Sequence, residues 1–364
     1  MKVKNVQISN FRGVRDVSID FSAPGEMARS LTAVFGDNCA GKTTVLQAVG
    51  LVLAAATGKS RVEQFPWHGF IPDRISTLGR TSIEIMVGFE PDEIQATRGL
   101  FEEWRACFET SGDVSEKIAP DNLEQVTLQF DGRNVRAREG RAAYFQFRGR
   151  YYLKQIATMS ARERAERFKT VGDVFWFDQY RNLGSAGARN GDTKGDSVPA
   201  ETWVAGVEAL RQFLVGAWTY HVQTYKGAGV DHVLELEPQL ARVFPGIRIV
   251  GVQPRQSGIS EDPGGFYFLF ERAGRMYDLA ELSSGEQAVF PLVYEFVRLS
   301  ITRSVVLVDE VELHLHPPEQ QALLAALPRL GADCQFIVSS HSPYLMDVVP
   351  VEAQVRMSEG RRCQ

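Results

Sequence analysis

A glycine-rich stretch near the start of the chain has the residue types and the spacing that hold phosphate groups. The stretch "GDNCAGKT", Gly36 to Thr43, matches the pattern G-x-x-x-x-G-K-[ST]. In such a loop backbone N–H groups curl around phosphates, the lysine offers a positive charge to the β and γ phosphates, and the threonine hydroxyl is placed to hold Mg²⁺. The sequence therefore predicts a nucleoside triphosphate site. Its expected contacts are Gly36, Asn38, Gly41, Lys42, Thr43 and Thr44.

Two acidic residues follow a short apolar run in the C-terminal part of the chain. The run "VVLV" at 305–308 predicts a strand buried on both faces, and Asp309 and Glu310 come directly after it. Ligands of open α/β sheets bind at the carboxyl ends of the strands. We expect Asp309, with Thr43, to orient Mg²⁺, and Glu310 to be the general base that polarises an attacking water. An ordinary strand that ends in solvated acids is the alternative.

A further group of possible metal ligands comes directly after these acids. Glu312, His314 and His316 are spaced so that they could ligate zinc or manganese. The same residues run into a proline-initiated helix, which favours a loop that packs against a neighbouring subunit.

A histidine follows another buried strand, within "CQFIVSSHSPYLM". His341 lies 32 residues after Asp309, which leaves room for one helix and one parallel strand to return beside the acid strand. As a functional residue, His341 would be a γ-phosphate sensor that also holds Glu310 in place. A neutral histidine of the core is the alternative.

The stretch "LSSGEQ" at 282–287 is a second place that could hold phosphate. Ser283, Ser284, Gly285 and Glu286 open an apolar helix, and a helix N-terminus attracts anions through its free N–H groups and its dipole. A plain capped helix start is the alternative.

The patterning around these motifs predicts an α/β fold. Alternation over 3–11 and 15–22 predicts a hairpin, and "SLTAVFG" predicts a buried strand that enters the glycine loop, followed by a helix over 42–56. Residues 124–155 read as strands joined by turns near 132 and 140. After residue 284, helices and strands alternate, which is typical of a parallel sheet covered by helices.

Together the motifs resemble a known family. "GDNCAGKTT", "LSSGEQ", "VVLVDEVELHLHP" and "VSSHSP" are similar to motifs of the ABC-type ATPases of the RecF, SMC and OLD group, above all the short, armless AAA-type ATPases of prokaryotic defence and repair operons. The opening "ISNFRG" also resembles the start of those chains. The motifs stand in the family order and cover nearly the whole chain. One departure is Cys39, where the family often has glycine, and it puts the backbone conformation and redox behaviour of the loop in question.

The resemblance implies a P-loop fold of the ABC-ATPase type. Such a fold has a mixed sheet with an antiparallel N-terminal β-subdomain, a central parallel sheet flanked by helices, and a small inserted helical/β lid. The implied division is an N-terminal half at 1–182, a variable insertion at 183–281 with a mobile loop at 184–199, and a C-terminal half at 282–364.

The resemblance also implies ATP and Mg²⁺ as ligands and a head-to-tail homodimer or higher even oligomer. In the family the helix that begins at the "LSSGE" turn caps the γ-phosphate bound by a second subunit. Gln179, which ends a predicted strand, is the candidate for the glutamine that links Mg²⁺ and the γ-phosphate to a moving lobe. Arg12 resembles an arginine near the nucleotide, and an ordinary surface arginine is the alternative.

Composition excludes several classes. With 44% hydrophobic and 23% charged residues the chain is an ordinary globular protein, and a net charge of −5 argues against blanket nucleic-acid binding. Its four scattered cysteines predict neither a disulfide framework nor a zinc site. No signal peptide or membrane span is expected, so we expect a cytoplasmic location without a membrane partner.

The expected function is an ATP-driven switch or scaffold for a separate effector, such as a nuclease, in anti-phage defence or DNA processing. Only 23 residues follow His341, too few for the nuclease domain of OLD-type chains. One alternative is a RecF-like repair ATPase that binds DNA or RNA through arginines and aromatics interleaved over 133–154. Another is a sensor that assembles on ATP and barely hydrolyses it. A transporter subunit is disfavoured by the 240 residues between Lys42 and Leu282.

Overall fold

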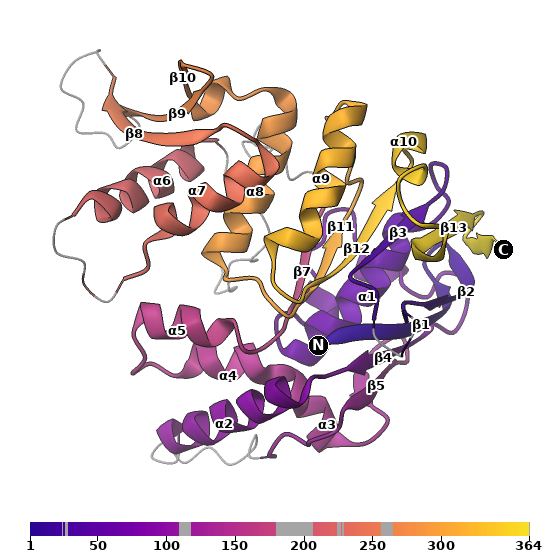
Figure 1. Cartoon of the computed structure of the whole chain (residues 1–364). Coiled ribbons are helices and arrows are strands. Elements are labelled where there is room, and N and C mark those ends of the chain that lie inside the picture. The colour runs from indigo at the N-terminus through magenta and orange to yellow at the C-terminus, as the bar shows by residue number, and fades with distance from the viewer. Residues whose placement is uncertain are drawn as a thin grey trace.

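One large mixed sheet runs through the molecule and carries helices on both faces (Figure 1). The computed structural model describes residues 1–23, 25, 28–108, 118–179, 207–223, 227, 229–255 and 265–363. The mobile loop expected at 184–199 lies outside the described residues.

Adjacent parallel strands form one half of this sheet. In order they are β3 (Leu31–Phe35), β12 (Gln335–Ser340), β11 (Val305–Val308) and β7 (Val174–Phe177). Val308 at the end of β11 pairs with Val338 on one side and with Phe177 on the other. Because parallel strands share one direction, the carboxyl ends of all four lie along a single edge of the sheet.

Antiparallel strands form the other half. They are β1 (Lys2–Phe11), β2 (Val14–Asp20), β4 (Ser82–Gly88), β5 (Gln125–Phe130) and β6 (Val135–Ala137). The C-terminal strands β13 (Gln354–Ser358) and β14 (Arg361–Cys363) join the two halves, so the full order is β6-β5-β4-β1-β2-β14-β13-β3-β12-β11-β7. The predicted N-terminal hairpin and mixed sheet are confirmed.

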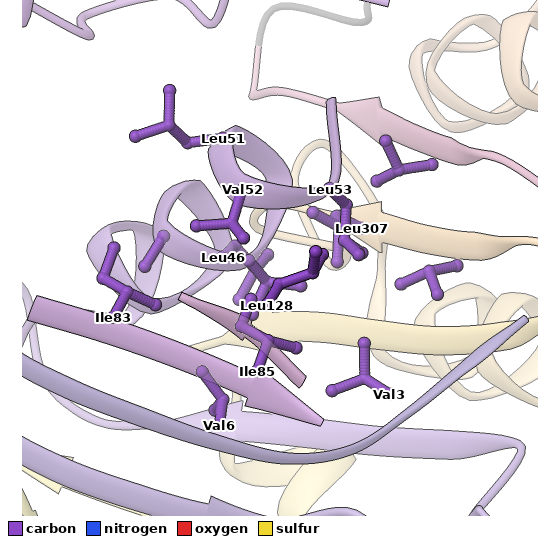
Figure 2. Packing of buried hydrophobic residues seen from close by; sticks show 14 of the residues in the cluster. Val3, Val6, Leu46, Leu51, Val52, Leu53, Ile83, Ile85, Leu128 and Leu307 are labelled. Atoms are coloured by element: carbon purple, nitrogen blue, oxygen red, sulfur yellow. The ribbon is translucent and has the colours of Figure 1, made fainter. Parts of the chain in front are cut away.

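One face of the sheet is covered by α1 (Lys42–Thr57), the helix that follows the glycine loop. Figure 2 shows Leu46, Val52 and Leu53 of α1 against Val6 of β1 and Ile85 of β4, within one buried cluster. The helix is apolar nearly all round because it is enclosed by the curved antiparallel strands as well as the parallel ones.

The opposite face carries a second group of helices and a small sheet. Its members are α6 (Val207–Val222), α7 (His232–Val243), α8 (Ser284–Arg298), α9 (Pro317–Leu330) and the strands β8 (Arg248–Pro254), β9 (Phe266–Arg272) and β10 (Arg275–Asp278). Successive residues of β11 show the two faces: Val305 and Leu307 belong to the α1 cluster, whereas Val306 and Val308 belong to the other.

Another group of helices lies beside and below the antiparallel strands in Figure 1. It consists of α2 (Pro91–Phe108), α3 (Arg141–Phe145), α4 (Gly149–Gln155) and α5 (Ala161–Phe168). Short turns link the larger elements: η1 (Val62–Gln64), η2 (Pro72–Arg74), η3 (Gln146–Arg148), η6 (Leu279–Glu281), η7 (Val351–Ala353) and α10 (Pro343–Met346).

The strand prediction for the end of 124–155 is wrong, because residues 141–155 are helical. The aromatic residues of this segment have a high intrinsic propensity for β-strands, and the strand prediction followed from that propensity. In the fold they are spaced for helices, and Tyr152 packs against Phe101 and Trp104 of α2. Tertiary packing overrides propensity here.

The division into segments at 182 and 281 stays a prediction. Residues before and after the insertion share one sheet, since β7 and β11 are neighbours. The described part of 183–281 contributes α6, α7 and the three-stranded sheet.

Candidate functional site

The glycine loop lies between β3 and the first turn of α1. A Cβ at Gly36 would come within 2.5 Å of the Met357 carbonyl oxygen, so only glycine fits where the loop leaves the strand. Lys42 is buried, and its Nζ donates to the carbonyl oxygens of Gly36 at 2.7 Å and Asp37 at 2.9 Å. The lysine charge is thus held inside the curve of the loop.

The backbone conformation at Cys39 is one that glycine adopts more easily than other residues. Its φ is +65°, in the left-handed region that residues with a Cβ adopt at a cost of about 1–2 kcal/mol. Its side chain is exposed. The departure from glycine therefore leaves the turn formed, with some backbone strain.

Thr43 forms a hydrogen bond with Asp309, the first acid after β11. Its Oγ1 donates to Asp309 Oδ1 at 2.9 Å and lies 3.0 Å from Oδ2. Asp309 is 2% exposed, and Ser339 Oγ of β12 donates to the same Oδ1 atom at 2.5 Å. A hydroxyl and a carboxylate in contact are the hard oxygen donors that suit Mg²⁺, which takes its other ligands from water and phosphates.

Glu310 stands in a strained backbone conformation beside Asp309. Its φ is +46°, and its N–H donates to Ser339 Oγ at 2.8 Å. Non-glycine residues with positive φ persist where their surroundings hold them, and they cluster at functional sites. One serine hydroxyl thus bonds to the side chain of the first acid and to the main chain of the second.

His341 follows β12 and pairs with Glu312. Its Nδ1 lies 3.0 Å from Glu312 Oε1, and its main-chain N–H donates to the same oxygen at 2.6 Å. The alternative of a histidine inside the core is wrong, because the His341 side chain is 49% exposed.

The alternative metal cluster of Glu312, His314 and His316 is also wrong. Glu312 is taken up by His341, and His316 caps α9 through a main-chain N–H to Glu319 Oε2 at 3.2 Å. Within the described part of the chain no group of three or more histidine, cysteine or acidic side chains is arranged to hold a metal ion.

Gln179 lies just after β7, on the far side of the acid strand from His341. Asp309 N–H donates to the carbonyl of Phe177 at 2.8 Å, which places the two strand ends side by side. The order β3, β12, β11, β7 therefore sets the glycine loop, His341, the acid pair and Gln179 along one edge. We call these four groups the motif row.

The second turn of the chain opens α8. Ser283 caps the helix: its Oγ accepts from Glu286 N–H at 3.3 Å, and its own N–H donates to Glu286 Oε2 at 2.9 Å. A Cβ at Gly285 would come within 2.6 Å of Glu319 Oε2, so glycine allows α8 to start against α9. The side chain of Ser284 lies outside the described parts.

The position of this turn relative to the glycine loop is set by the sheet. α1 packs into one face, and Val289, Phe290 and Val293 of α8 pack into the other. In Figure 1, α9 stands between α8 and the strands that lead to the glycine loop. Ser283 and Lys42 thus belong to separate layers.

Arg12 lies beside α1 and outside the motif row. Its guanidinium donates to Gln47 Oε1 and to the Gly69 carbonyl at 3.1 Å, and it stands 5.5 Å from the ring centre of Phe70. Burial, together with the nearby charge of Arg74, lowers the pKa of Arg12 below its ordinary value. Its described contacts support a role in joining β1 to α1.

The arginines of 133–154 have different surroundings in the fold. Arg136 pairs with Asp131 at 2.6 Å and Arg138 with Glu84 at 2.8 Å. Arg150 is 4% exposed and donates to main-chain carbonyls, including that of Ser300 at 2.7 Å. Phe147 and Tyr152 are buried. Ion pairs and burial account for these members of the interleaved pattern, whereas Arg133, Arg141 and Lys154 are exposed.

The sequence analysis did not identify two residues that contact the acid pair and His341. Ser339 was not singled out, and Glu312 was considered only as a metal ligand. The position of Ser339, two residues before His341, could have indicated its role, since alternate residues of a strand face the same side of the sheet.

The fold and the motif row have the arrangement expected of a P-loop ATPase, and they agree with the resemblance to the RecF, SMC and OLD group. The chain belongs to the family described as "AAA domain, putative AbiEii toxin, Type IV TA system", which matches residues 163–347. A second family, "AAA ATPase domain", matches residues 1–160.

Relatives agree with this assignment. Over 96% of its length the chain is 24% identical to an OLD nuclease of Thermus scotoductus, and the match covers 61% of that protein. It is 32% identical over 90 residues to a retron Vc95 probable ATPase of Vibrio cholerae, a match that covers 22% of this chain and 18% of the relative. The chain thus spans less than two thirds of the curated relatives it matches.

Among solved structures, an SMC head bound to the C-terminal winged-helix domain of ScpA has a similar fold. The TM-score is 0.52 at 14% identity, and the match covers 100% of this chain and 97% of that one. Among the described residues, no helix combines the length and apolar character needed to cross a membrane.

Proposed function

We propose that this chain binds ATP with Mg²⁺, hydrolyses it slowly, and acts as a dimeric switch or scaffold for a separate effector in prokaryotic defence or DNA processing. The observation that carries the proposal is the motif row, in which the Thr43 and Asp309 side chains are already in contact across two elements. A phosphate loop and an acid pair at the same edge of a parallel sheet are the parts that phosphoryl transfer requires.

Each residue of the row has a role that follows from its position. Lys42 and the loop N–H groups bind the β and γ phosphates, and Thr43, Asp309 and Gln179 would hold Mg²⁺. Neutralisation of phosphate charge is the chemistry that the ion supplies when bound. Glu310 orients and polarises the attacking water as general base, and His341 contacts the terminal phosphate.

The placement of α8 supports a second subunit in the site. The Ser283 turn is exposed and belongs to the layer opposite α1, so a second copy related by twofold symmetry could bring its own Ser283, Gly285 and Glu286 to this chain's phosphate loop. Free N–H groups at the start of α8 would then meet the γ-phosphate. ATP would hold the two copies together.

The effector role is inferred from the named relatives. Retron ATPases and an OLD nuclease are the proteins with which this chain shares its sequence, and the latter is longer than the matched region. DNA or RNA binding through 133–154 stays an alternative: Arg136 and Arg138 are ion-paired and Arg150 is buried, whereas Arg133 and Arg141 are exposed.

The test is steady-state ATP hydrolysis by wild type and Glu310→Gln. Removal of the general base should lower kcat by about 100-fold or more while ATP binding persists. Glu352→Gln, an exposed carboxylate of η7, is the matched control and should turn over like wild type. Equal turnover by wild type and Glu310→Gln would reject hydrolysis at this site and favour an assembly sensor.

A further inference from the structure

Glu312 and His341 form a pair that connects the interior to the surface beside the motif row. Glu312 is 5% exposed in its side chain, whereas His341 is 49% exposed. The same Glu312 oxygen meets both the ring Nδ1 and the main-chain N–H of His341. The carboxylate is therefore fixed inside the protein, and the imidazole extends from it towards solvent.

The chemistry of this contact determines which ring nitrogen is left free. An ionised carboxylate only accepts hydrogen bonds, so the nitrogen that faces Glu312 must carry a proton. That nitrogen is Nδ1, and Nε2 on the other side of the ring becomes the atom that can meet a ligand. Oε2 of Glu312 is buried without a hydrogen-bond partner among the described residues, so both hydrogen bonds of the carboxylate go to His341.

The backbone around Glu312 is held on the same framework as the acid pair. Val311 N–H donates to the Ser339 carbonyl at 3.1 Å, and Leu315 N–H donates to the Glu312 carbonyl at 3.0 Å. Glu310 N–H donates to Ser339 Oγ. A movement of the β12 end would therefore shift His341 and Glu310 together.

We infer that Glu312 is the positioning residue for His341, and that it selects the ring orientation and the Nδ1-protonated form that presents Nε2 to the terminal phosphate. The inference rests on the proposed ATP site. A hydrogen bond from Nε2 to a phosphate oxygen requires a proton on Nε2, while Nδ1 keeps its own proton in the bond to Glu312. Outer partners of this kind orient functional histidines through the nitrogen that the ligand does not use.

The kinetic test is a double-mutant cycle with Glu312→Gln, His341→Ala and the double variant. Glutamine keeps the shape and the acceptor for the main-chain N–H but removes the charge. We expect kcat to fall about 10-fold in Glu312→Gln and about 100-fold in His341→Ala. The double variant should match His341→Ala, because a positioning residue has no effect once the positioned ring is absent. A double variant that loses the product of both factors would overturn the inference.

A second readout works without ATP turnover. In ¹⁵N-histidine-labelled, ligand-free protein, the chemical shifts of the ring nitrogens distinguish Nδ1–H from Nε2–H, and loss of one signal set in His341→Ala identifies His341 among the six histidines. We expect a protonated Nδ1 in wild type and a shift towards Nε2–H in Glu312→Gln. Nε2–H in wild type, or identical spectra in the two proteins, would reject the inference.

The controls separate this inference from the proposed function. Glu295→Gln removes another buried, ion-paired carboxylate, at the far end of α8, and should leave kcat and the His341 spectrum unchanged. If no ATPase activity is found, the spectrum still decides whether Glu312 positions the ring. The wild-type spectrum alone remains decisive if Glu312→Gln does not fold.

Discussion

A single buried hydroxyl joins the two acids that follow β11. Ser339 is fully buried, and its Oγ donates to Asp309 and accepts from the main chain of Glu310. Buried polar groups that lose their partner cost about 1–3 kcal/mol, because water is not available to replace it. The sequence placed both acids correctly at the end of a strand, but nothing local indicated that a serine of another strand connects them.

Removal of this hydroxyl by Ser339→Ala should lower the free energy of unfolding by about 1–3 kcal/mol. It should also lower kcat, because Glu310 loses the bond that holds its strained backbone. Urea unfolding and steady-state hydrolysis measure the two effects. Ser18→Ala, on the exposed side of β2, is the control and should change neither. Unchanged stability of Ser339→Ala would show that the serine bonds contribute nothing net.

Cys334 provides a prediction with a defined pH window. Burial raises the pKa of its thiol to about 11, above the ordinary value near 9. The folded state therefore keeps the proton while the unfolded state loses it. The buried, protonated thiol therefore contributes to the free energy of unfolding. That contribution is fully present below about pH 9 and is lost as the pH rises towards 11. Unfolding free energies measured across that window should fall less in Cys334→Ala than in wild type, and an equal fall would contradict the assignment.

At the start of α8, two helices approach each other closely. Gly285 lies against Glu319, whose carboxylate accepts from the main chain of His316 at the start of α9. The periodic pattern was sufficient to predict both helices, whereas the strand prediction for 141–155 failed because those aromatics pack against α2. Local pattern decides an element when one face is apolar, and tertiary contacts decide it when propensity and packing disagree.

Gly285→Ala should destabilise the fold, because the added Cβ displaces the Glu319 carboxylate from its capping position. Loss of such a cap costs about 0.5–2 kcal/mol, and thermal unfolding measures it. Gly216→Ala in the exposed interior of α6 is the matched control, since nothing lies within 4 Å of the added atom. That change should raise stability by about 0.5–1 kcal/mol. Equal behaviour of the two variants would exclude a close contact at Gly285.

The whole molecule places the two turns that we propose bind phosphate in different layers. The glycine loop leads into α1 on one face of the sheet, and the Ser283 turn opens α8 on the other. Within a single chain these layers are kept apart by the buried strands. Two chains related by a twofold axis can bring one turn of each kind together twice.

The proposed pairing predicts that ATP converts Glu310→Gln from monomer to dimer, as measured by sedimentation velocity. Ser283→Arg should abolish this dimer, because arginine obstructs the contact with the second copy. It also removes the α8 cap, but ATP binding to the monomer should persist, because Ser283 and the glycine loop lie in separate layers. Ser160→Arg removes a comparable serine cap from α5 and should dimerise normally. A Ser283→Arg protein that loses ATP binding as a monomer would place the turn over its own nucleotide and reject the pairing.

The sequence by itself determined the phosphate loop, the acid pair, the strand-ending histidine and the class of fold, because each depends on short spacing and on apolar periodicity. Only the tertiary structure decided that these groups stand in one row, since the order of strands in the sheet is set by long-range pairing of β3, β12, β11 and β7. It also decided the partners of the row, Ser339 and Glu312, and it buried Arg150 among main-chain carbonyls. Those outcomes depend on which side chains meet across the sheet, and residues that meet there are far apart along the chain.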